Sequence, residues 1–204
     1  MQFLAEARIE MPMLEDEEPE IFTVDEATAL LNAAARMPDS HLVPMLGIGL
    51  FAGLRTSELK TLDWSEIDFE RRVILVTGKK AKTRHRRHVK ISDNLAAWLT
   101  PHRASGGKIV AGRFRERLSE VVSKAREELT EAGKSAALKK WPKNGLRHSF
   151  ASYHLGFNQN AASIALELGH ADTTMLFAHY RSLVKPNEAE RYWNIAPSAD
   201  AKKV

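Results

Sequence analysis

The chain of 204 residues is long enough for one ordinary domain with a sizeable core, or for two small ones at most. Its composition, 44% apolar and 27% charged residues, is that of a soluble globular protein and excludes wholesale disorder, collagen-like repeats and coiled-coil bias. Cysteine is absent, which excludes disulfides, cysteine-ligated zinc and thiol nucleophiles. The N-terminus lacks the pattern of a secretory signal, and nowhere do about 18 apolar residues run together. We therefore expect a cytoplasmic protein without a membrane partner.

The formal net charge of +4 is an average over unlike parts of the chain. Residues 1–20 contain seven acids and one base, whereas residues 21–204 carry a net charge of +10. We interpret residues 1–20 as an acidic linker or arm and residues 197–204 as a flexible tail. Nine Lys and Arg residues, and no acid, fall within residues 71–90. Because this segment also contains β-branched stretches, it predicts a folded basic hairpin suited to a phosphate backbone rather than a solvated charged tail.

Hydrophobic periodicity predicts a mainly helical α+β domain with one small antiparallel β-sheet or hairpin. Thr23 and Glu26 form a capping box at the start of the first helix, which ends near Pro38. Residues 42–52 are apolar nearly all round, which predicts a buried central helix that ends at Gly53. The other predicted elements are a short helix at 56–62, strands at 67–69, 73–77 and 87–91, and helices at 93–99 (capped by Ser92), 112–132, 146–155, 160–168, 173–180 and 187–194.

Two passages carry residue patterns that point to chemistry. Residues 53–59 read GLRTSEL, and residues 144–181 begin NGLRHSFASYHLGF and end ELGHADTTMLFAHYR. Each residue taken singly has a structural explanation, such as a pairing of Arg55 with Glu58 one helical turn along. Taken together and in this order, the motifs resemble those of the catalytic domain of the tyrosine recombinase (phage integrase) family. The resemblance covers about residues 21–195, essentially the whole predicted folded part.

Four family motifs have counterparts in order along the chain. The family has an Arg in G-L-R-x-x-E-L, which Arg55 matches, and a second Arg in L-R-H-[ST]-F-A, which Arg147 matches. Its L-G-H motif ends here at His170. In the family a Tyr follows about nine or ten residues later, and Tyr180 stands at that position.

Two further positions follow from the alignment with these motifs. The family carries a Lys on a β-hairpin, eight residues before the Pro of a V-P-[LI] return strand. Lys90 stands at that Pro position, so Lys82 is the predicted counterpart, with Lys79 in reserve. The family's H-x-x-R has His where this chain has Asn144, which can donate a hydrogen bond but cannot take up a proton near neutral pH.

The resemblance implies an enzyme that cleaves and rejoins DNA through a 3′-phosphotyrosyl intermediate, without a metal or other cofactor. Two guanidiniums suit the phosphate oxygens because they are permanently charged, bidentate donors. Tyr180 is the implied nucleophile, and Lys82 the acid that protonates the departing 5′ oxygen. The implied catalytic residues are Arg55, Lys82, Asn144, Arg147, His170 and Tyr180. Contacts with the DNA backbone are expected from Lys79, Lys80, Arg84, Arg86 and Arg87.

The resemblance also implies partners and a domain arrangement. Double-stranded DNA is the expected partner, on which family members assemble as homo-oligomers, commonly tetramers, in bacterial or phage nucleoids. The C-terminal helix at 187–194 is expected to contact a neighbouring protomer, with packing in cis as the alternative. Residues 21–196 correspond to the catalytic domain, whereas residues 1–20 leave no room for the N-terminal core-binding domain of the family. We therefore expect either a fragment or an unusually short member.

Three alternatives stay open. Because Asn144 replaces the motif His, the chain could be a catalytically impaired relative that only binds DNA. It could also be a type IB topoisomerase-like enzyme, which would share the chemistry but relax supercoils. A non-enzymatic helix-turn-helix module could use residues 160–180. Its second helix, TTMLFAHY, has no Lys, Arg, Asn or Gln to bind bases or phosphates, which argues against this module.

Overall fold

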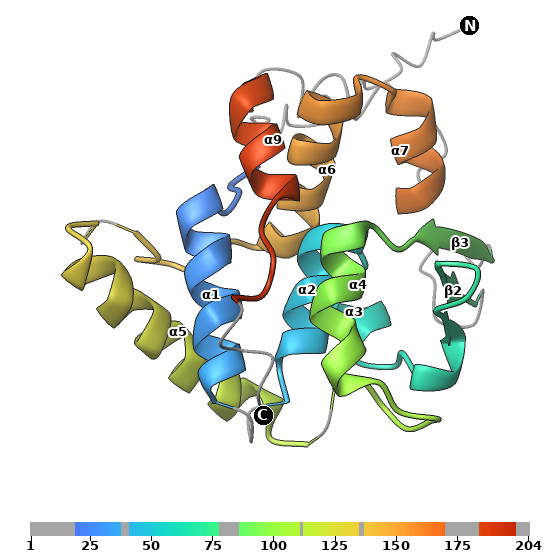
Figure 1. Ribbon diagram of the computed structural model, residues 1–204, viewed down its shortest axis with the longest axis horizontal. Helices are drawn as coiled ribbons and strands as arrows, with labels where there is room; N and C mark the ends of the chain where they lie inside the picture. Colours follow the sequence, from blue (N-terminus) through green and yellow to red (C-terminus); the bar gives the residue numbers. More distant parts are fainter. Residues whose placement is uncertain are drawn as a thin grey trace, which may run out of the picture.

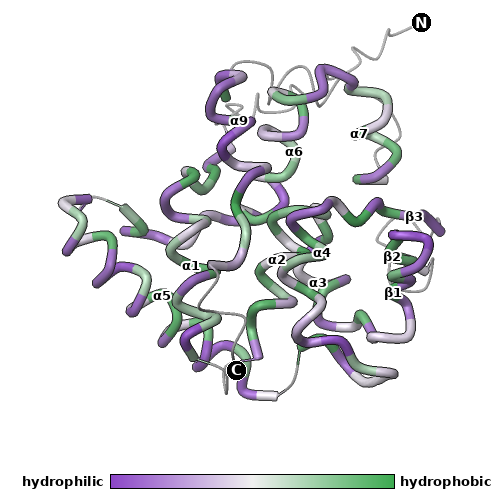
Figure 2. The backbone as a smooth tube through the Cα atoms, viewed as in Figure 1, coloured by the Kyte–Doolittle hydropathy of each residue, from purple (hydrophilic) through white to green (hydrophobic). Residues whose placement is uncertain are grey.

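Helix α2 (Val43–Ala52) forms the centre of the computed structural model, and all ten of its residues are buried. The structure describes residues 19–37, 41–77, 86–110, 112–134, 137–169 and 184–198. No charged residue lies in the first or last turn of α2, so the helix has no polar face to turn to solvent. Figure 2 shows it as a largely hydrophobic tube in the middle of the molecule. Gly53 ends the helix in a left-handed conformation with φ 64°.

Three helices pack directly or indirectly on α2. Helix α1 (Val24–Arg36) lies between α2 and α5 (Phe114–Glu131), which forms one outer side of the molecule (Figure 1). The predicted capping box of α1 is confirmed, because Thr23 and Glu26 exchange hydrogen bonds. Helix α4 (Asp93–Leu99) packs on α2 and continues into the short 3-10 helix η3 (Thr100–His102).

A second group of helices covers one end of α2. Helix α6 (Gly145–Asn158) packs on α2, and α7 (Ala161–Leu168) packs on both α6 and the sheet. Helix α9 (Pro186–Trp193) lies along α6 (Figure 1). Its Tyr192 is fully buried, stacks on Tyr153 with ring centroids 3.8 Å apart, and donates its hydroxyl hydrogen to the carbonyl of Leu50. The apolar side of the C-terminal helix therefore packs in cis.

The sheet has three antiparallel strands in the order β1 (Ile67–Asp68), β2 (Val73–Val76) and β3 (Arg87–Lys90). It lies on the opposite side of the molecule from α5 (Figure 1). Val73 pairs with Lys90, and Val76 with Arg87. The short helix α3 (Thr56–Leu59) and the 3-10 helix η2 (Trp64–Glu66) lead from α2 into β1.

The mainly helical α+β prediction is confirmed, and two local predictions need correction. The helix predicted at 56–62 ends at Leu59 and continues as a turn. Ser92 occupies the position before α4 but does not cap it, because its hydroxyl is hydrogen-bonded to the side chain of Asn94. The helix predicted at 173–180 lies outside the described residues, as do residues 1–18 of the predicted arm and 199–204 of the predicted tail.

Candidate active site

A carboxylate three residues along the chain holds Arg55 at the start of α3. The backbone N–H of Arg55 donates to Glu58 Oε2 at 2.8 Å, and its Nη1 donates to Glu58 Oε1 at 3.2 Å. The Glu58 side chain is 1% exposed, whereas that of Arg55 is 19% exposed. The predicted pairing of these two residues is confirmed. The geometry fixes the Arg55 backbone and leaves part of its side chain at the surface.

A second arginine, Arg87, reaches the same carboxylate from β3. Its Nη1 and Nη2 donate to the two oxygens of Glu58 at 2.9 and 2.8 Å, and its Nε donates to the carbonyl of Glu167 at 2.7 Å. The prediction that Arg87 contacts the DNA backbone is therefore wrong, because its guanidinium is buried and engaged inside the protein. Strand alternation could have indicated this orientation, since Arg87 shares the inward face of β3 with the core residue Val89.

The charges around Glu58 determine its ionisation. Burial by itself raises the pKa of the Glu58 carboxyl, but the hydrogen bonds from Arg87 and from the Arg55 backbone, together with the two positive charges, lower it below its ordinary value. Glu58 is therefore ionised at neutral pH. Two guanidiniums and one carboxylate leave this cluster with one net positive charge.

Arg147 joins the α2–α3 turn to the end of α7. It lies in the first turns of α6, is buried, and donates from Nη1 to the carbonyl of Gly53 and from Nη2 to the carbonyl of Leu168, each at 2.8 Å. Because Gly53 lies two residues before Arg55, these bonds tie Arg147 to the turn that leads into the first motif arginine. Leu168 lies two residues before His170.

Asn144 stands at the surface immediately before α6. It is exposed and has a left-handed backbone with φ 55°, a conformation that asparagine tolerates better than most residues. It lines a small cavity of about 120 Å³ together with Thr56 and Arg147. The structure thus places Asn144 beside Arg147 and across a small cavity from Thr56, the residue after Arg55.

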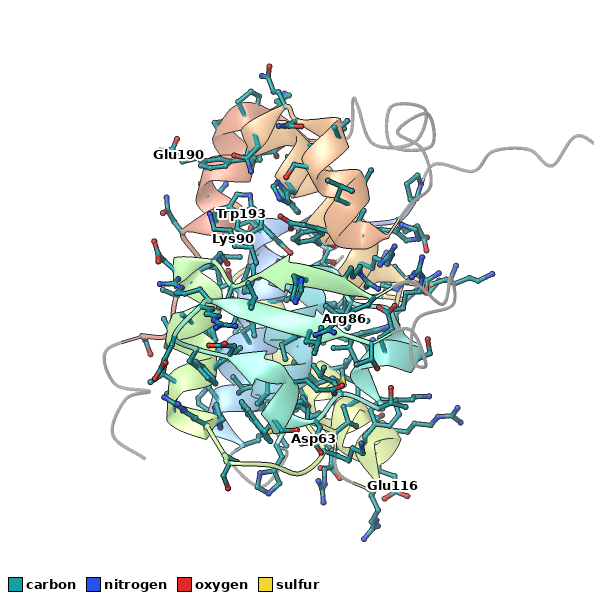
Figure 3. The ribbon with its side chains drawn as sticks, turned by 90° about the vertical axis from the view of Figure 1, so that its right-hand side faces the viewer. Asp63, Arg86, Lys90, Glu116, Glu190 and Trp193 are labelled. Carbon is teal, nitrogen blue, oxygen red and sulfur yellow. The ribbon has the colours of Figure 1, made fainter. Side chains whose placement is uncertain are left out.

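Among the predicted DNA contacts, Arg86 is the described residue that stands at the surface. It precedes β3, is exposed, and lies at the opposite end of that strand from Lys90 (Figure 3). The other predicted site residues lie outside the described part of the chain: Lys79, Lys80, Lys82, Arg84, His170 and Tyr180.

No group of three or more His, Asp or Glu side chains within the described ranges is arranged to hold a metal ion. Of the helices that the structure describes, none combines the length and the apolar character needed to cross a membrane.

Comparison with known proteins gives matches to one family. The model of the phage integrase family matches residues 20–186. Tyrosine recombinase XerC of Azotobacter vinelandii is 33% identical over 141 residues, which cover 66% of this chain and 46% of that protein. Tyrosine recombinase XerC of Xanthomonas campestris pv. campestris is 28% identical over 197 residues, which cover 91% of this chain and 58% of that protein. The chain thus spans about half the length of these curated relatives.

A solved structure shares the fold. The crystal structure of XerA recombinase superposes with a TM-score of 0.58 over 92% of this chain and 67% of that chain. The two sequences are 22% identical, so this likeness concerns the fold alone.

Proposed function

The chain belongs to the phage integrase family, and from this membership we propose that it is the catalytic part of a tyrosine recombinase. In this proposal residues 21–196 form the catalytic domain. The substrate is double-stranded DNA, and the reaction cleaves one strand and rejoins it, or a strand from a second duplex, through a phosphotyrosyl bond. The matched relatives are named as tyrosine recombinases, which supports this reaction class.

Arg55 and Arg147 bind the phosphate in the proposed reaction. Attack on a phosphodiester builds negative charge on the non-bridging oxygens, and fixed guanidiniums stabilise that charge without reorganising. Arg147 donates one N–H to each of the carbonyls of Gly53 and Leu168, and a guanidinium carries five N–H donors. The carbonyls orient the plane of Arg147, and Glu58 orients Arg55.

The covalent step is assigned to residues matched by motif. The hydroxyl of Tyr180 releases its proton to solvent water as its oxygen attacks the phosphorus, the bond from phosphorus to the 5′ oxygen breaks, and a 3′-phosphotyrosyl bond forms. Lys82 gives a proton to the departing 5′ oxygen. His170 and Asn144 act as further hydrogen-bond donors to the phosphate. Rejoining reverses the same steps, with a 5′ hydroxyl attacking the phosphotyrosyl bond.

The observation that carries the proposal is the hydrogen bond from Arg147 to the carbonyl of Gly53, which ties the second motif arginine to the turn that precedes the first. We test it with a randomised pool of nicked duplexes, in which the short strand beyond the nick diffuses away after cleavage and traps the covalent product. Wild-type protein is expected to give an adduct that survives denaturing electrophoresis, and Tyr180→Phe is expected to give none. DNA binding without any adduct would refute the enzyme and favour the impaired relative. Transfer of the trapped strand to a second duplex distinguishes recombination from the relaxation of supercoils.

We also propose that the chain assembles on DNA as a homo-oligomer of four. Because the inner side of α9 is occupied in cis, the contact with a neighbour is assigned to exposed residues of that helix. These include Asn187 and Glu190, which is labelled in Figure 3. Reversing one charge there with Glu190→Lys leaves Tyr192 in the core. The variant is expected to bind single duplexes normally and to form fewer two-duplex complexes in sedimentation experiments. Normal two-duplex assembly by Glu190→Lys would exclude this contact.

A further inference from the structure

The buried ion cluster of Arg55, Glu58 and Arg87 shares one carboxylate unequally between two arginines. Arg87 makes two hydrogen bonds to the carboxylate, at 2.9 and 2.8 Å, whereas the Arg55 guanidinium makes one, at 3.2 Å. Two parallel N–H···O bonds to a carboxylate are the stronger arrangement. Glu58 therefore interacts more strongly with the guanidinium of Arg87 than with that of Arg55.

Arg87 is fixed in place from several directions. Its side chain is 7% exposed, and its Nε is bound to the carbonyl of Glu167 at the end of α7. A Cβ atom added to Gly169 would lie 3.3 Å from its Cδ, so the stem of the arginine packs closely against the residue after α7. The side chain cannot swing away from Glu58 without breaking both sets of contacts.

We propose that Arg87 is a positioning residue that keeps Arg55 available to the DNA phosphate by holding Glu58. This inference rests on the proposed function. With Arg87 in place, the cluster has one net positive charge, which the partly exposed Arg55 presents at the surface. Without it, Glu58 is a buried carboxylate whose remaining cation among the described residues is Arg55. The Arg55 guanidinium is then drawn inward and neutralised.

The net charge of the cluster of Arg55, Glu58 and Arg87 distinguishes a positioning role of Arg87 from a merely structural one. Arg87→Met removes the second cation, so Glu58 neutralises Arg55. Adding Glu58→Gln removes the carboxylate as well, which returns one uncompensated positive charge to Arg55. A neutral pair of similar volume commonly replaces a buried ion pair without loss of folding. A structural role predicts that the double variant is no better than Arg87→Met, whereas the positioning role predicts that it is faster.

The measurement is the single-turnover rate of adduct formation at saturating DNA, with a nicked duplex selected from the randomised pool. Arg87→Met is expected to react about 100-fold more slowly, the size of effect seen when one transition-state donor is lost. Its DNA dissociation constant is expected to change little. Arg87→Lys keeps the charge but not the bidentate geometry and is expected to fall between wild type and Arg87→Met. The double variant is expected to recover part of the lost rate.

Arg126→Met is the control, because Arg126 also donates from two nitrogens to a structural acceptor, the carbonyl of Leu138, but lies on α5. It is expected to react at the wild-type rate. A wild-type rate for Arg87→Met, or a double variant no faster than Arg87→Met, would overturn the inference.

A second readout does not depend on activity. In protein labelled with ¹⁵N-arginine, the Nε–H resonance of Arg55 is identified as the one absent from Arg55→Lys. It is expected to shift in Arg87→Met and to stay unchanged in Arg126→Met. Failure of wild type to form any adduct would refute the proposed function alone. The resonance would then decide the inference, and an unshifted Arg55 signal in Arg87→Met would overturn it.

Discussion

Substitution of Gly53 by alanine tests whether the turn between α2 and α3 is as tightly packed as the site requires. Gly53 has φ 64°, and its carbonyl accepts the hydrogen bond from Arg147. A Cβ atom there would lie 2.4 Å from Cδ1 of Phe150, closer than Cβ atoms approach their neighbours in real proteins, and 3.0 Å from Cδ2 of Leu168, which is a tight contact. The left-handed backbone costs alanine about 1–2 kcal/mol, and overpacking adds about 1–3 kcal/mol. Together these terms remove about 2–5 kcal/mol from the free energy of unfolding.

The matched control is Gly133→Ala. Gly133 also has a left-handed backbone, with φ 76°, but a Cβ atom there would meet nothing within 4 Å. The difference between the two variants therefore isolates the steric cost at Gly53, expected at about 1–3 kcal/mol. Equilibrium unfolding in urea, followed by circular dichroism, measures both. Equal losses in the two variants would refute the reasoning, because they would mean that Phe150 moves aside at no cost.

Three further predictions concern the charge cluster, α9 and the DNA contact. Glu58→Gln is expected to cost about 3–5 kcal/mol at pH 7 by leaving Arg87 buried without its partner. Folding lowers the pKa of Glu58, so the stabilisation by its charged form is present above about pH 4.5 and is lost as the pH falls through the lowered pKa. The difference in free energy of unfolding between wild type and Glu58→Gln should therefore narrow in acid. A difference that stays constant with pH contradicts this. Tyr192→Phe loses the hydroxyl bond to Leu50 and should lower the free energy of unfolding by about 1 kcal/mol, read as a Tm decrease; an unchanged Tm contradicts the bond. Arg86→Gln should lower the slope of log affinity against log salt concentration by about 1, and an unchanged slope would exclude a phosphate contact.

Local features of the chain could be predicted because local physics determines them. The ten residues of α2 are apolar on every side, so no arrangement other than burial suits them. The capping box of Thr23 and the pairing of Arg55 with Glu58 depend on residues three positions apart, a spacing that one helical turn brings together. The family membership inferred from the four motifs is confirmed by the match to the phage integrase family.

Long-range partners could not be predicted in the same way. The bonds of Arg147 to Gly53 and Leu168 join residues far apart in sequence, and nothing in the residue types indicates which backbone carbonyls a buried guanidinium will find. The stacking of Tyr192 on Tyr153, which decides that α9 packs in cis, is of the same kind. The many positive charges near the hairpin led to the prediction that Arg87 faces the DNA. The alternation of buried and exposed residues along β3 indicates instead that Arg87 points inward.

The two buried arginines explain how motifs scattered along the sequence reach one place. Arg87 binds the carbonyl of Glu167 and Arg147 binds that of Leu168, so both hold the last turn of α7, where positive charge is favoured by the helix dipole. Their other donors reach Glu58 and Gly53, which flank Arg55. The end of α7 leads to His170, the third motif. Arg87 and Arg147 therefore link the first motif to the third through backbone carbonyls and the buried carboxylate of Glu58. A substitution that displaces either arginine is expected to change the distance between the two motifs even where every proposed catalytic side chain is intact.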